Sequence, residues 1–349
     1  MELMKMTLGM DLAKMVEFNP KELNWPDGEL NAGLTHLDKD CQDANMRANK
    51  KGIMSSAYQV VKNQPVSGVL SGFDSETAKM FMPNKYFDNA FRPAASYHSS
   101  SSGSYNYQDA AKVESFWVDF SDAYLGGGVF RNGFLQEEAM CCEIPELANA
   151  AGLRWDDKRK GFHTREPAED APTPGLYPTP WILRNALRTY DIPPEWKKDN
   201  YITKNKLNTT TIESHKRTNA QRVNVLAMAA PLSQSRELTH QLGQALVDDL
   251  FNTFVAAFTL ARETAKQPVL INSGPIGTGD FHNNRYLVYV LQVLAAQETG
   301  VNLALWYYPD AVASEAEKLL GMLKPPWEKT TINYRLNDVR NLPWPTDST

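Results

Sequence analysis

Short apolar runs alternate along the chain with longer stretches in which apolar residues recur at helical spacing. The runs lie at 114–120, 222–230, 268–272 and 302–308. Their length and their β-branched and aromatic content predict buried strands. Apolar residues recur every four positions from Leu238 to Phe258, which predicts a long helix over 235–266. Similar spacing at 287–294 predicts a helix that ends near Gly300. Strands that alternate with helices predict an α/β sheet covered by helices on both faces.

Other segments lack such a pattern, and their composition is the better guide. Residues 1–50 are rich in Met and polar side chains, and we expect a loosely packed lead-in with one or two helices. The Ser- and Tyr-rich segment 96–109 predicts an exposed, solvated linker. Residues 154–218 are charged and rich in proline, which indicates an insertion with one helix around 181–189.

Near the end of the chain, Ser314 and Glu317 have the spacing of a capping box, which predicts the start of a last helix. Pro-Trp and Trp-Pro pairs follow Pro325, and we expect this tail to lie along the surface. The chain is thereby divided into an N-terminal extension, 1–110, a main domain, 111–325, with the insertion 154–218, and a C-terminal tail, 326–349.

The composition is that of a protein with a sizeable core. The chain has 349 residues, 42% of them hydrophobic, enough for one large domain or two ordinary ones. Its 36 basic and 41 acidic residues give a net charge of −5, which argues against binding of duplex nucleic acid. No stretch approaches the ~20 apolar residues that cross a bilayer, and the N-terminus lacks the pattern of a secretory signal. We therefore expect a soluble monomer without a membrane partner, in the cytoplasm or, for a secreted effector, in a host cytosol.

The placement of cysteine and histidine argues against a metal site. Cys41, Cys141 and Cys142 are too few and too unevenly spaced for a disulfide framework or a zinc site. The six histidines show no paired ligand spacing. We therefore expect reduced cysteines, no metal and no cofactor.

Three consecutive glycines, Gly126 to Gly128, follow the strand predicted at 114–120. Without side chains there, the backbone can approach a ligand closely and present its N–H groups. Because a helical stretch begins just beyond, the turn suits a phosphate or a diphosphate. A tight strand-to-helix turn that binds nothing is the alternative.

A second glycine-rich turn, Ser273 to Phe281, follows the strand predicted at 268–272. It lacks the Gly-Lys-Ser/Thr ending of a Walker A loop, and the chain lacks the dinucleotide-binding spacing of glycines. Ligands in α/β sheets bind at the carboxyl ends of strands, where both turns fall. Two turns on neighbouring strands would hold opposite sides of one diphosphate, whereas two unrelated tight turns would bind nothing.

Two adjacent glutamates, Glu137 and Glu138, lie shortly after the first turn. Side chains that are adjacent on a helix point about 100° apart, so one carboxylate at most faces a given atom. A carboxylate beside a bound ribose can donate a proton to a departing glycosidic oxygen and later activate water. Away from the glycines, such a pair would be typical of a solvated helix surface.

The order of these motifs resembles the signature of the poly(ADP-ribose) glycohydrolases, a family of catalytic macrodomains. Val118 to Asp122 (Val-Asp-Phe-Ser-Asp) precedes the glycines, and seven residues separate Gly128 from Gln136, which opens Gln-Glu-Glu. The second turn, 273–281, is similar to the phosphate loop of the family. The similarity spans two segments, 113–150 and 220–310.

The resemblance implies a macrodomain-like three-layer α/β/α sandwich with a mixed sheet that holds ADP-ribose in a cleft. It implies that Glu138 is the catalytic acid and that Glu137 contacts the ribose and orients the site. The residues implied to contact ADP-ribose are Asp119, Asp122, Gly126, Gly127, Gly128, Val129, Gln136, Gly277, Thr278, Gly279, Asp280 and Phe281. Asp119 would lie nearer the adenosine. The sequence departs from the family at Asp122, which replaces an Asn, and at Ile276, which replaces an aromatic residue.

The activity that the resemblance implies is hydrolysis at the anomeric carbon of an ADP-ribosyl group, without a metal. The substrate stays open between a poly(ADP-ribose) polymer and a mono-ADP-ribosylated protein, for example one modified on arginine or a modified ubiquitin. A non-catalytic reader of ADP-ribose is a further possibility, although a reader needs no carboxylates at the anomeric carbon. A structural α/β domain with coincidental glycine turns is the remaining alternative.

Overall fold

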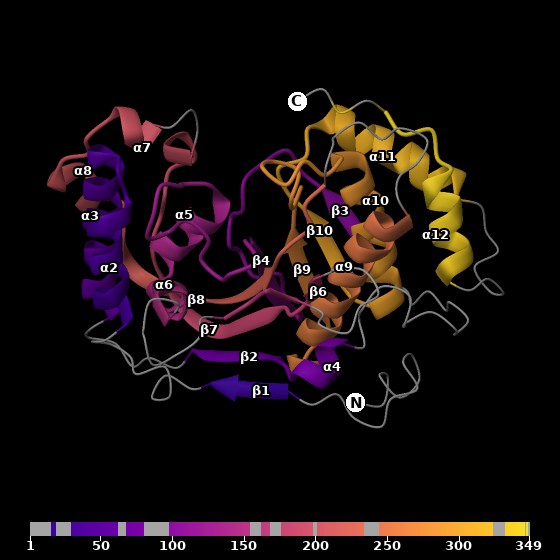
Figure 1. Cartoon of the computed structure of the whole chain (residues 1–349), viewed down its shortest axis with the longest axis horizontal. Helices are drawn as coiled ribbons and strands as arrows, with labels where there is room; N and C mark the ends of the chain where they lie inside the picture. The colour runs from indigo at the N-terminus through magenta and orange to yellow at the C-terminus, as the bar shows by residue number, and fades with distance from the viewer. Residues whose placement is uncertain are drawn as a thin grey trace.

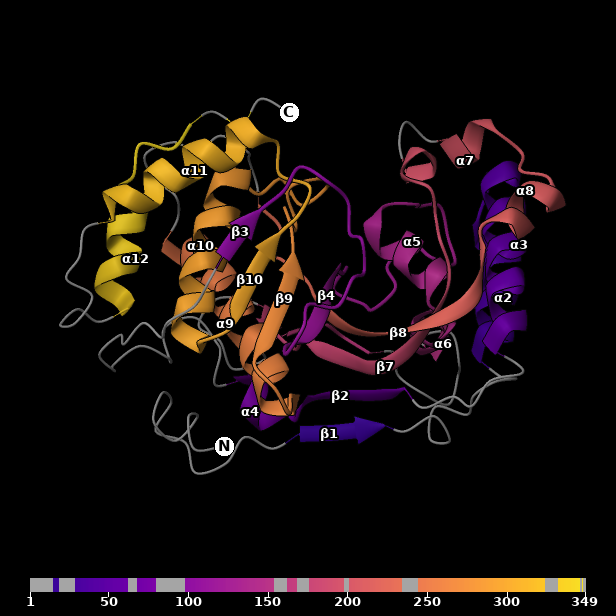
Figure 2. The same ribbon diagram turned by 180° about the vertical axis from the view of Figure 1, so that it is seen from behind.

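A computed structural model describes residues 15–18, 29–61, 68–79, 98–153, 162–167, 176–197, 201–233, 244–323, 332–345 and 347. In these residues an eight-stranded sheet lies between two groups of helices, as Figures 1 and 2 show from opposite sides. The expected three-layer α/β/α arrangement with a mixed sheet is confirmed.

The sheet has the strand order β1-β2-β7-β8-β4-β9-β10-β3. Its strands are β1 (Met15–Phe18), β2 (Val69–Phe73), β3 (His98–Ser100), β4 (Glu114–Phe120), β7 (Trp181–Tyr190), β8 (Lys216–Met228), β9 (Val269–Ser273) and β10 (Asn302–Leu305). The strands from β8 to β3 are parallel, whereas β1, β2, β7 and β8 pair antiparallel. Because β4 pairs with β9, the two glycine turns leave neighbouring strands at the same edge of the sheet. A separate two-stranded sheet contains β5 (Arg165–Pro167) and β6 (Leu176–Pro178).

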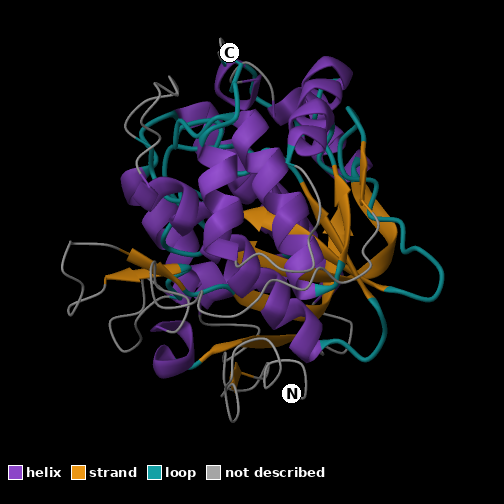
Figure 3. Cartoon of the chain, turned by 90° about the vertical axis from the view of Figure 1, so that its right-hand side faces the viewer, coloured by secondary structure: helices purple, strands orange, loops and turns teal. Residues whose placement is uncertain are grey.

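Helices cover both faces of the sheet. The first group comprises α2 (Glu29–Asp40), α3 (Ala44–Val61), α5 (Gln136–Glu143), α6 (Pro145–Gly152), the short 3-10 helix η2 (Pro194–Lys197), α7 (Tyr201–Lys204) and α8 (Thr209–Ser214). The second group comprises α9 (Gln244–Thr264), α10 (Arg285–Thr299), α11 (Asp310–Met322) and α12 (Ile332–Arg340), and Figure 3 shows these helices in front of the strands. A short helix, α4 (Ser75–Lys79), follows β2. No described helix combines the length and the apolar character that a bilayer span requires.

The central strand β4 contributes to two hydrophobic cores. Phe116 and Val118 pack in the core formed with α9 and α10, whereas Trp117 packs in the core formed with α3, α5 and α6. Successive side chains of a strand point to opposite faces, so this continuous apolar run fills both cores. Such a strand is rigid at both faces and gives a fixed base for the turn that follows it.

The helix expected around 181–189 is wrong, because this segment is the long strand β7 in the middle of the antiparallel half of the sheet. The register of β7 against β8 shifts between Leu183 and Ala186, where Asn185 adopts a positive φ of 59°. This irregularity changes which face the next side chains point to. It gives the buried residues of the strand a spacing that imitates a helix.

The exposed linker expected at 96–109 is wrong in part: 102–104, 106, 108 and 109 are exposed, other residues form a strand or are buried, and 96 and 97 lie outside the described residues. His98–Ser100 form β3 at the edge of the sheet, and Tyr105 and Tyr107 are buried against Trp117. Their ring centroids lie 5.2 and 4.8 Å from that of Trp117. Aromatic packing of this kind outweighs the polar composition of the neighbouring serines.

The ends of other elements differ from expectation. The helix expected over 235–266 is α9, and 235–243 lie outside the described residues. The last helix before the tail begins at Asp310, after Pro309, so the start expected at Ser314 is wrong. The expected tail contains a further helix, α12.

Candidate active site

A cavity of about 340 Å³ lies at the carboxyl edge of β4 and β9. Its walls come from the end of β4, from the first glycine turn with the start of α5, and from the second glycine loop. The lining residues are Phe120, Ser121, Asp122, Gly127, Gly128, Asn132, Gly133, Leu135, Gln136, Glu137, Glu138, Pro275, Gly277, Gly279, Asp280 and Phe281. The two glycine turns that the sequence singled out therefore face one cavity.

The first turn requires glycine at two positions. Gly126 and Gly127 have φ values of 89° and 42°, which L side chains rarely adopt. A Cβ at Gly126 would lie 2.2 Å from Cβ of Ala151, and a Cβ at Gly127 would lie 2.4 Å from Oε2 of Glu137. The missing side chains thus let the turn close directly onto α5 and α6.

Glu137 is held by two backbone N–H groups of this turn. The N–H of Asp122 donates to Oε2 at 2.9 Å, and the N–H of Gly126 donates to Oε1 at 2.6 Å. Both carboxylate oxygens are therefore held by the backbone that follows β4.

Glu138 is held in the same way but by the other end of the turn. The N–H of Gly128 donates to Oε1 at 2.9 Å, and the N–H of Leu135 donates to Oε2 at 2.7 Å. The second bond is one half of a capping box, in which the glutamate in the first turn of α5 accepts from the N–H of the N-cap residue Leu135. Two carboxylates that diverge on the helix are thus both immobilised, because the turn wraps around the helix terminus.

These bonds change the role expected for the triple glycine. The N–H of Gly127 donates to the carbonyl of Tyr124 at 3.0 Å, and those of Gly126 and Gly128 donate to the glutamates. All three N–H groups are used inside the protein, so they do not point at a phosphate. The first turn organises carboxylates, whereas the second loop has open space at Gly279, where a Cβ would meet nothing within 4 Å.

The buried carboxyls influence one another's protonation. Burial, followed by the negative charges of Asp119 and Glu138, raises the pKa of Glu137 well above its usual value, and the two N–H bonds offset this in part. Burial also raises the pKa of Asp119 to about 7, although the Ser121 hydroxyl lowers it. Glu137 and Asp119 therefore retain a proton at higher pH than an ordinary carboxyl does.

Gln136 fastens the start of α5 to the end of β4. Its Oε1 accepts from the N–H of Phe120 at 2.8 Å, and its Nε2 donates to the carbonyl of Val118 at 3.0 Å. The side chain continues the hydrogen bonding of the strand where the sheet ends. The position of the glutamates therefore follows that of the central strand.

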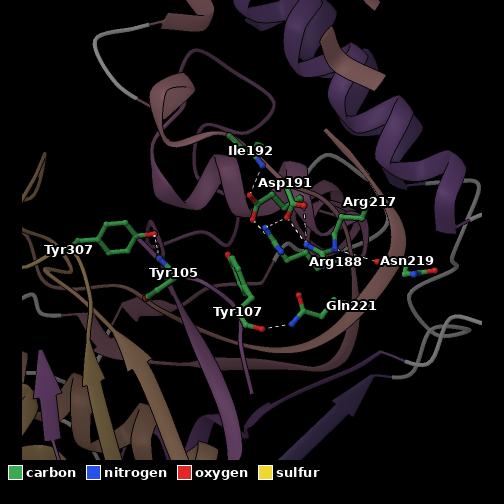
Figure 4. A network of polar contacts seen from close by, with 10 residues as sticks. Tyr105, Tyr107, Arg188, Asp191, Ile192, Arg217, Asn219, Gln221 and Tyr307 are labelled. Carbon is green, nitrogen blue, oxygen red and sulfur yellow. Dashed lines mark hydrogen bonds and ion pairs between the residues drawn. The ribbon is translucent and has the colours of Figure 1, made fainter. Parts of the chain in front are cut away.

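The other end of α5 is anchored by a buried ion pair with Arg188, which is labelled in Figure 4 together with Ile192 and Tyr107. Nε of Arg188 donates to Glu143 at 3.1 Å, and the N–H of Ile192 donates to the second oxygen of Glu143 at 2.8 Å. The guanidinium also lies 4.0 Å from the ring centroid of Tyr107. Both termini of this two-turn helix are thus fixed by hydrogen bonds to carboxylates or amides.

Most residues implied by the resemblance line the cavity, and four do not. Asp119 is fully buried beneath it, with Oδ2 accepting from the Ser121 hydroxyl at 2.7 Å. Val129 packs in the core, and Gly126 and Thr278 lie outside the lining. In this conformation these residues support the wall or lie next to it.

Sequence reasoning missed several lining residues, among them Asn132 and Leu135. Both lie in the spacer between the triple glycine and Gln-Glu-Glu. Their position between the two motifs could have indicated that they line the cavity. Leu135 has 54% of its surface exposed, unusual for a leucine at the mouth of a polar cavity. The buried Lys50 contacts the same wall from α3, and no local sequence signal connects it with the site.

Within the described residues, no group of three or more His, Cys, Asp or Glu side chains is arranged to hold a metal ion. Cys41, Cys141 and Cys142 are buried free thiols.

Comparisons with known proteins connect the chain only to solved structures. No protein-family model matches it, and no curated protein matches it by sequence. It is similar to the poly(ADP-ribose) glycohydrolase of Thermomonospora curvata, with 12% identity, a TM-score of 0.45, and coverage of 77% of this chain and 88% of that one. It is also similar to the poly(ADP-ribose) glycohydrolase of Deinococcus radiodurans in complex with ADP-ribose, with 13% identity, a TM-score of 0.43, and coverage of 70% and 88%. A macrodomain of Oceanobacillus iheyensis with MES bound matches with 13% identity, a TM-score of 0.33, and coverage of 60% and 86%.

Proposed function

We propose that this chain is an ADP-ribosyl glycohydrolase that cleaves the bond at the anomeric carbon of a bound ADP-ribosyl group. The observation that carries the proposal is the pair of glutamates fixed side by side on the wall of the cavity. The opposite wall is the second glycine loop, which has open space at Gly279. A catalytic carboxylate and a backbone surface for a diphosphate thus face the same volume.

Glu138 is assigned as the general acid on its position in the Gln-Glu-Glu motif and in the cavity wall. It donates a proton to the oxygen that leaves the anomeric carbon, and positive charge develops on the ribose ring. Water then adds to the anomeric carbon, and its proton returns to the carboxylate. Glu137, which is immobilised by the N–H groups of Asp122 and Gly126, contacts and orients the ribose. Its carboxyl also lies beside the positive charge that develops on the ribose ring.

The diphosphate is assigned to the second loop, 277–281. This loop lines the cavity and has open space at Gly279, whereas the N–H groups of the first turn are already bonded to carboxylates and a carbonyl. With this assignment, the phosphates and the glutamates lie on opposite walls of the cavity. A ribose between them would have its anomeric carbon within reach of Glu138.

The test is release of ADP-ribose from purified poly(ADP-ribose) and from mono-ADP-ribosylated proteins, including ubiquitin and arginine-linked substrates. We expect Glu138→Gln to lose about 10²–10⁴-fold in turnover, the usual contribution of general acid–base catalysis. ADP-ribose binding, measured by titration calorimetry, should remain. Glu195→Gln is the matched control, because Glu195 is exposed and lies outside the cavity lining.

The outcomes separate the substrate classes. Turnover of the polymer alone identifies a ribose–ribose linkage, and turnover of a modified protein alone identifies a protein de-ADP-ribosylase. Binding of ADP-ribose without any turnover would reject the enzyme and leave a reader. Full activity of Glu138→Gln would reject the assignment of the acid.

A further inference from the structure

The hairpin formed by α2 and α3 holds the wall of the cavity from behind. Residues 41–50 make hydrogen bonds with the loop 128–133, which follows the triple glycine. The N–H groups of Gln42 and Asp43 donate to Oδ1 of Asn132 at 3.1 and 3.4 Å. The N–H of Gly133 lies 3.3 Å from Sδ of Met46. Asn132 and Gly133 line the cavity, so helices distant in sequence support this wall.

Lys50 is the buried centre of these contacts. Its side chain is fully buried, which is costly for an ammonium group unless its protons are bound by acceptors. Nζ donates to the carbonyl of Gly128 at 2.9 Å and to the carbonyl of Arg131 at 2.8 Å. One cation thus connects Gly128 and Arg131, two positions of the loop that forms the wall.

Gly128 connects Lys50 to the proposed catalytic acid. Its carbonyl accepts from Lys50, and its N–H donates to Oε1 of Glu138. The two bonds act on neighbouring peptide groups, so displacement of the carbonyl would also turn the N–H away from the carboxylate. A shift of about 1 Å in a catalytic group can cost on the order of 10² in rate.

We propose that Lys50 is a positioning residue, which fixes Gly128 and thereby the orientation of the Glu138 carboxylate. The inference rests on the proposed function, because the role of Lys50 is defined by the reaction at Glu138. Lys50 itself does not line the cavity.

The charged and titratable groups around Lys50 are few. Glu138, Cys141 and Cys142 face it from α5, and Cys41 faces it from the end of α2. Burial lowers the pKa of Lys50, and the charge of Glu138 opposes that shift. The protonated form is the one that donates to both carbonyls and attracts the Glu138 carboxylate.

The experiment compares Lys50→Met with Lys51→Met. Methionine has a similar length but no charge and no donor, and Lys51 is an exposed neighbour on α3 that pairs with Asp38 at 2.6 Å. For Lys50→Met we expect kcat to fall on the order of 10²-fold with a much smaller change in KM. The alkaline limb of the rate profile should also move to higher pH, because a positive charge near the acid has been removed. Lys51→Met should match the wild type.

The variant Lys50→Arg distinguishes a positioning role from a loss of folding. It keeps a cation and its donors but changes their geometry, so we expect partial recovery of kcat relative to Lys50→Met. Thermal unfolding of each variant defines temperatures at which all are folded. If folded Lys50→Met kept the kcat and the pH profile of the wild type, the positioning role would be wrong.

Amide hydrogen exchange separates the two proposals. The N–H of Gly128 should exchange faster in Lys50→Met than in Lys51→Met, because its bond to Glu138 is loosened. If the wild type turned over no ADP-ribosyl substrate, the proposed function would fail, and the exchange rate would still test the link from Lys50 to Gly128. Unchanged exchange at Gly128 would overturn that link even in an active enzyme.

Discussion

Asp119 is an acidic side chain enclosed at the end of the central strand. One of its oxygens accepts from Ser121, and the other has no hydrogen-bond partner among the described residues. Burial of a carboxyl without full hydrogen bonding disfavours its charged form. The raised pKa of about 7 follows from this position.

This shift makes stability depend on pH in a defined direction. The ordinary pKa of 3.8 applies in the unfolded chain, so between about pH 4 and pH 7 the folded protein binds the proton more tightly. Stability therefore falls as pH rises through this window, by at most about 1.4 kcal/mol for each pH unit from this group. Asp119→Asn removes the titration and should make the decline shallower in urea unfolding measured between about pH 5 and pH 8.

Asp338→Asn, at an exposed position, is the control and should keep the pH dependence of the wild type. An equal decline in Asp119→Asn and the wild type would mean that Asp119 does not hold the proton.

At the residue scale, the sequence identified Glu137 and Glu138 but not their protonation or their partners. The Gln-Glu-Glu motif and the glycines are local patterns, so they were visible. The carboxylates bind the N–H groups of the same turn that was expected to face a phosphate. That reversal depends on the path of the backbone, and residue identity alone does not determine it.

At the element scale, the two glycine turns differ in how they are packed. The first turn presses against α6, where the Cβ of Ala151 occupies the space beside Gly126. The second loop is open at Gly279. Gly277 of the same loop is packed, because a Cβ there would lie 2.5 Å from Cβ of Ala230, so the open space in this loop is at Gly279.

Alanine substitutions should separate these roles. Gly126→Ala places a Cβ 2.2 Å from Ala151 at a φ of 89°, so we expect a loss of roughly 2 kcal/mol or more in the free energy of unfolding. Gly279→Ala meets nothing within 4 Å and should change stability by less than about 0.5 kcal/mol. Chemical denaturation of both variants measures the difference. Equal destabilisation would show that the first turn is not packed as described.

Elements in which the apolar residues keep one spacing were predictable from the sequence. Elements in which that spacing changes were not. The uninterrupted run of β4 and the four-residue stripe of α9 were correctly assigned. The register shift in β7 gives its buried residues a spacing close to that of a helix, so the segment was predicted as a helix. The burial of Tyr105 depends on Trp306 and Tyr307, some 200 residues away, and no local window contains them.

At the scale of the whole molecule, the sheet draws strands from all parts of the chain. β2 and β3 come from the segment expected as an extension, and β7 comes from the segment expected as an insertion. α3 adds buried residues to the core beside α5 and α6. The apolar faces of the central domain are therefore covered only when these segments are present.

A fragment comprising residues 111–325 should accordingly fail to fold cooperatively. It would lack the strands that pair with β7 and β10 and the tyrosines that cover Trp117. We expect strong binding of a hydrophobic dye and no sharp thermal transition, with the full chain as the control. A cooperative transition comparable with that of the full chain would show that the extension is dispensable for folding.

The cavity wall has one more consequence, which concerns salt. The described lining includes the carboxyl groups of Asp122, Glu137, Glu138 and Asp280 but no lysine or arginine. A diphosphate bound there by neutral N–H groups is repelled by its surroundings, and dissolved ions screen that repulsion. The affinity for ADP-ribose, titrated at low and high ionic strength, should therefore hold steady or rise with salt. A steep loss of affinity would instead reveal a cation at the ligand. With these charges, added salt does not weaken the occupancy of this cavity by ADP-ribose.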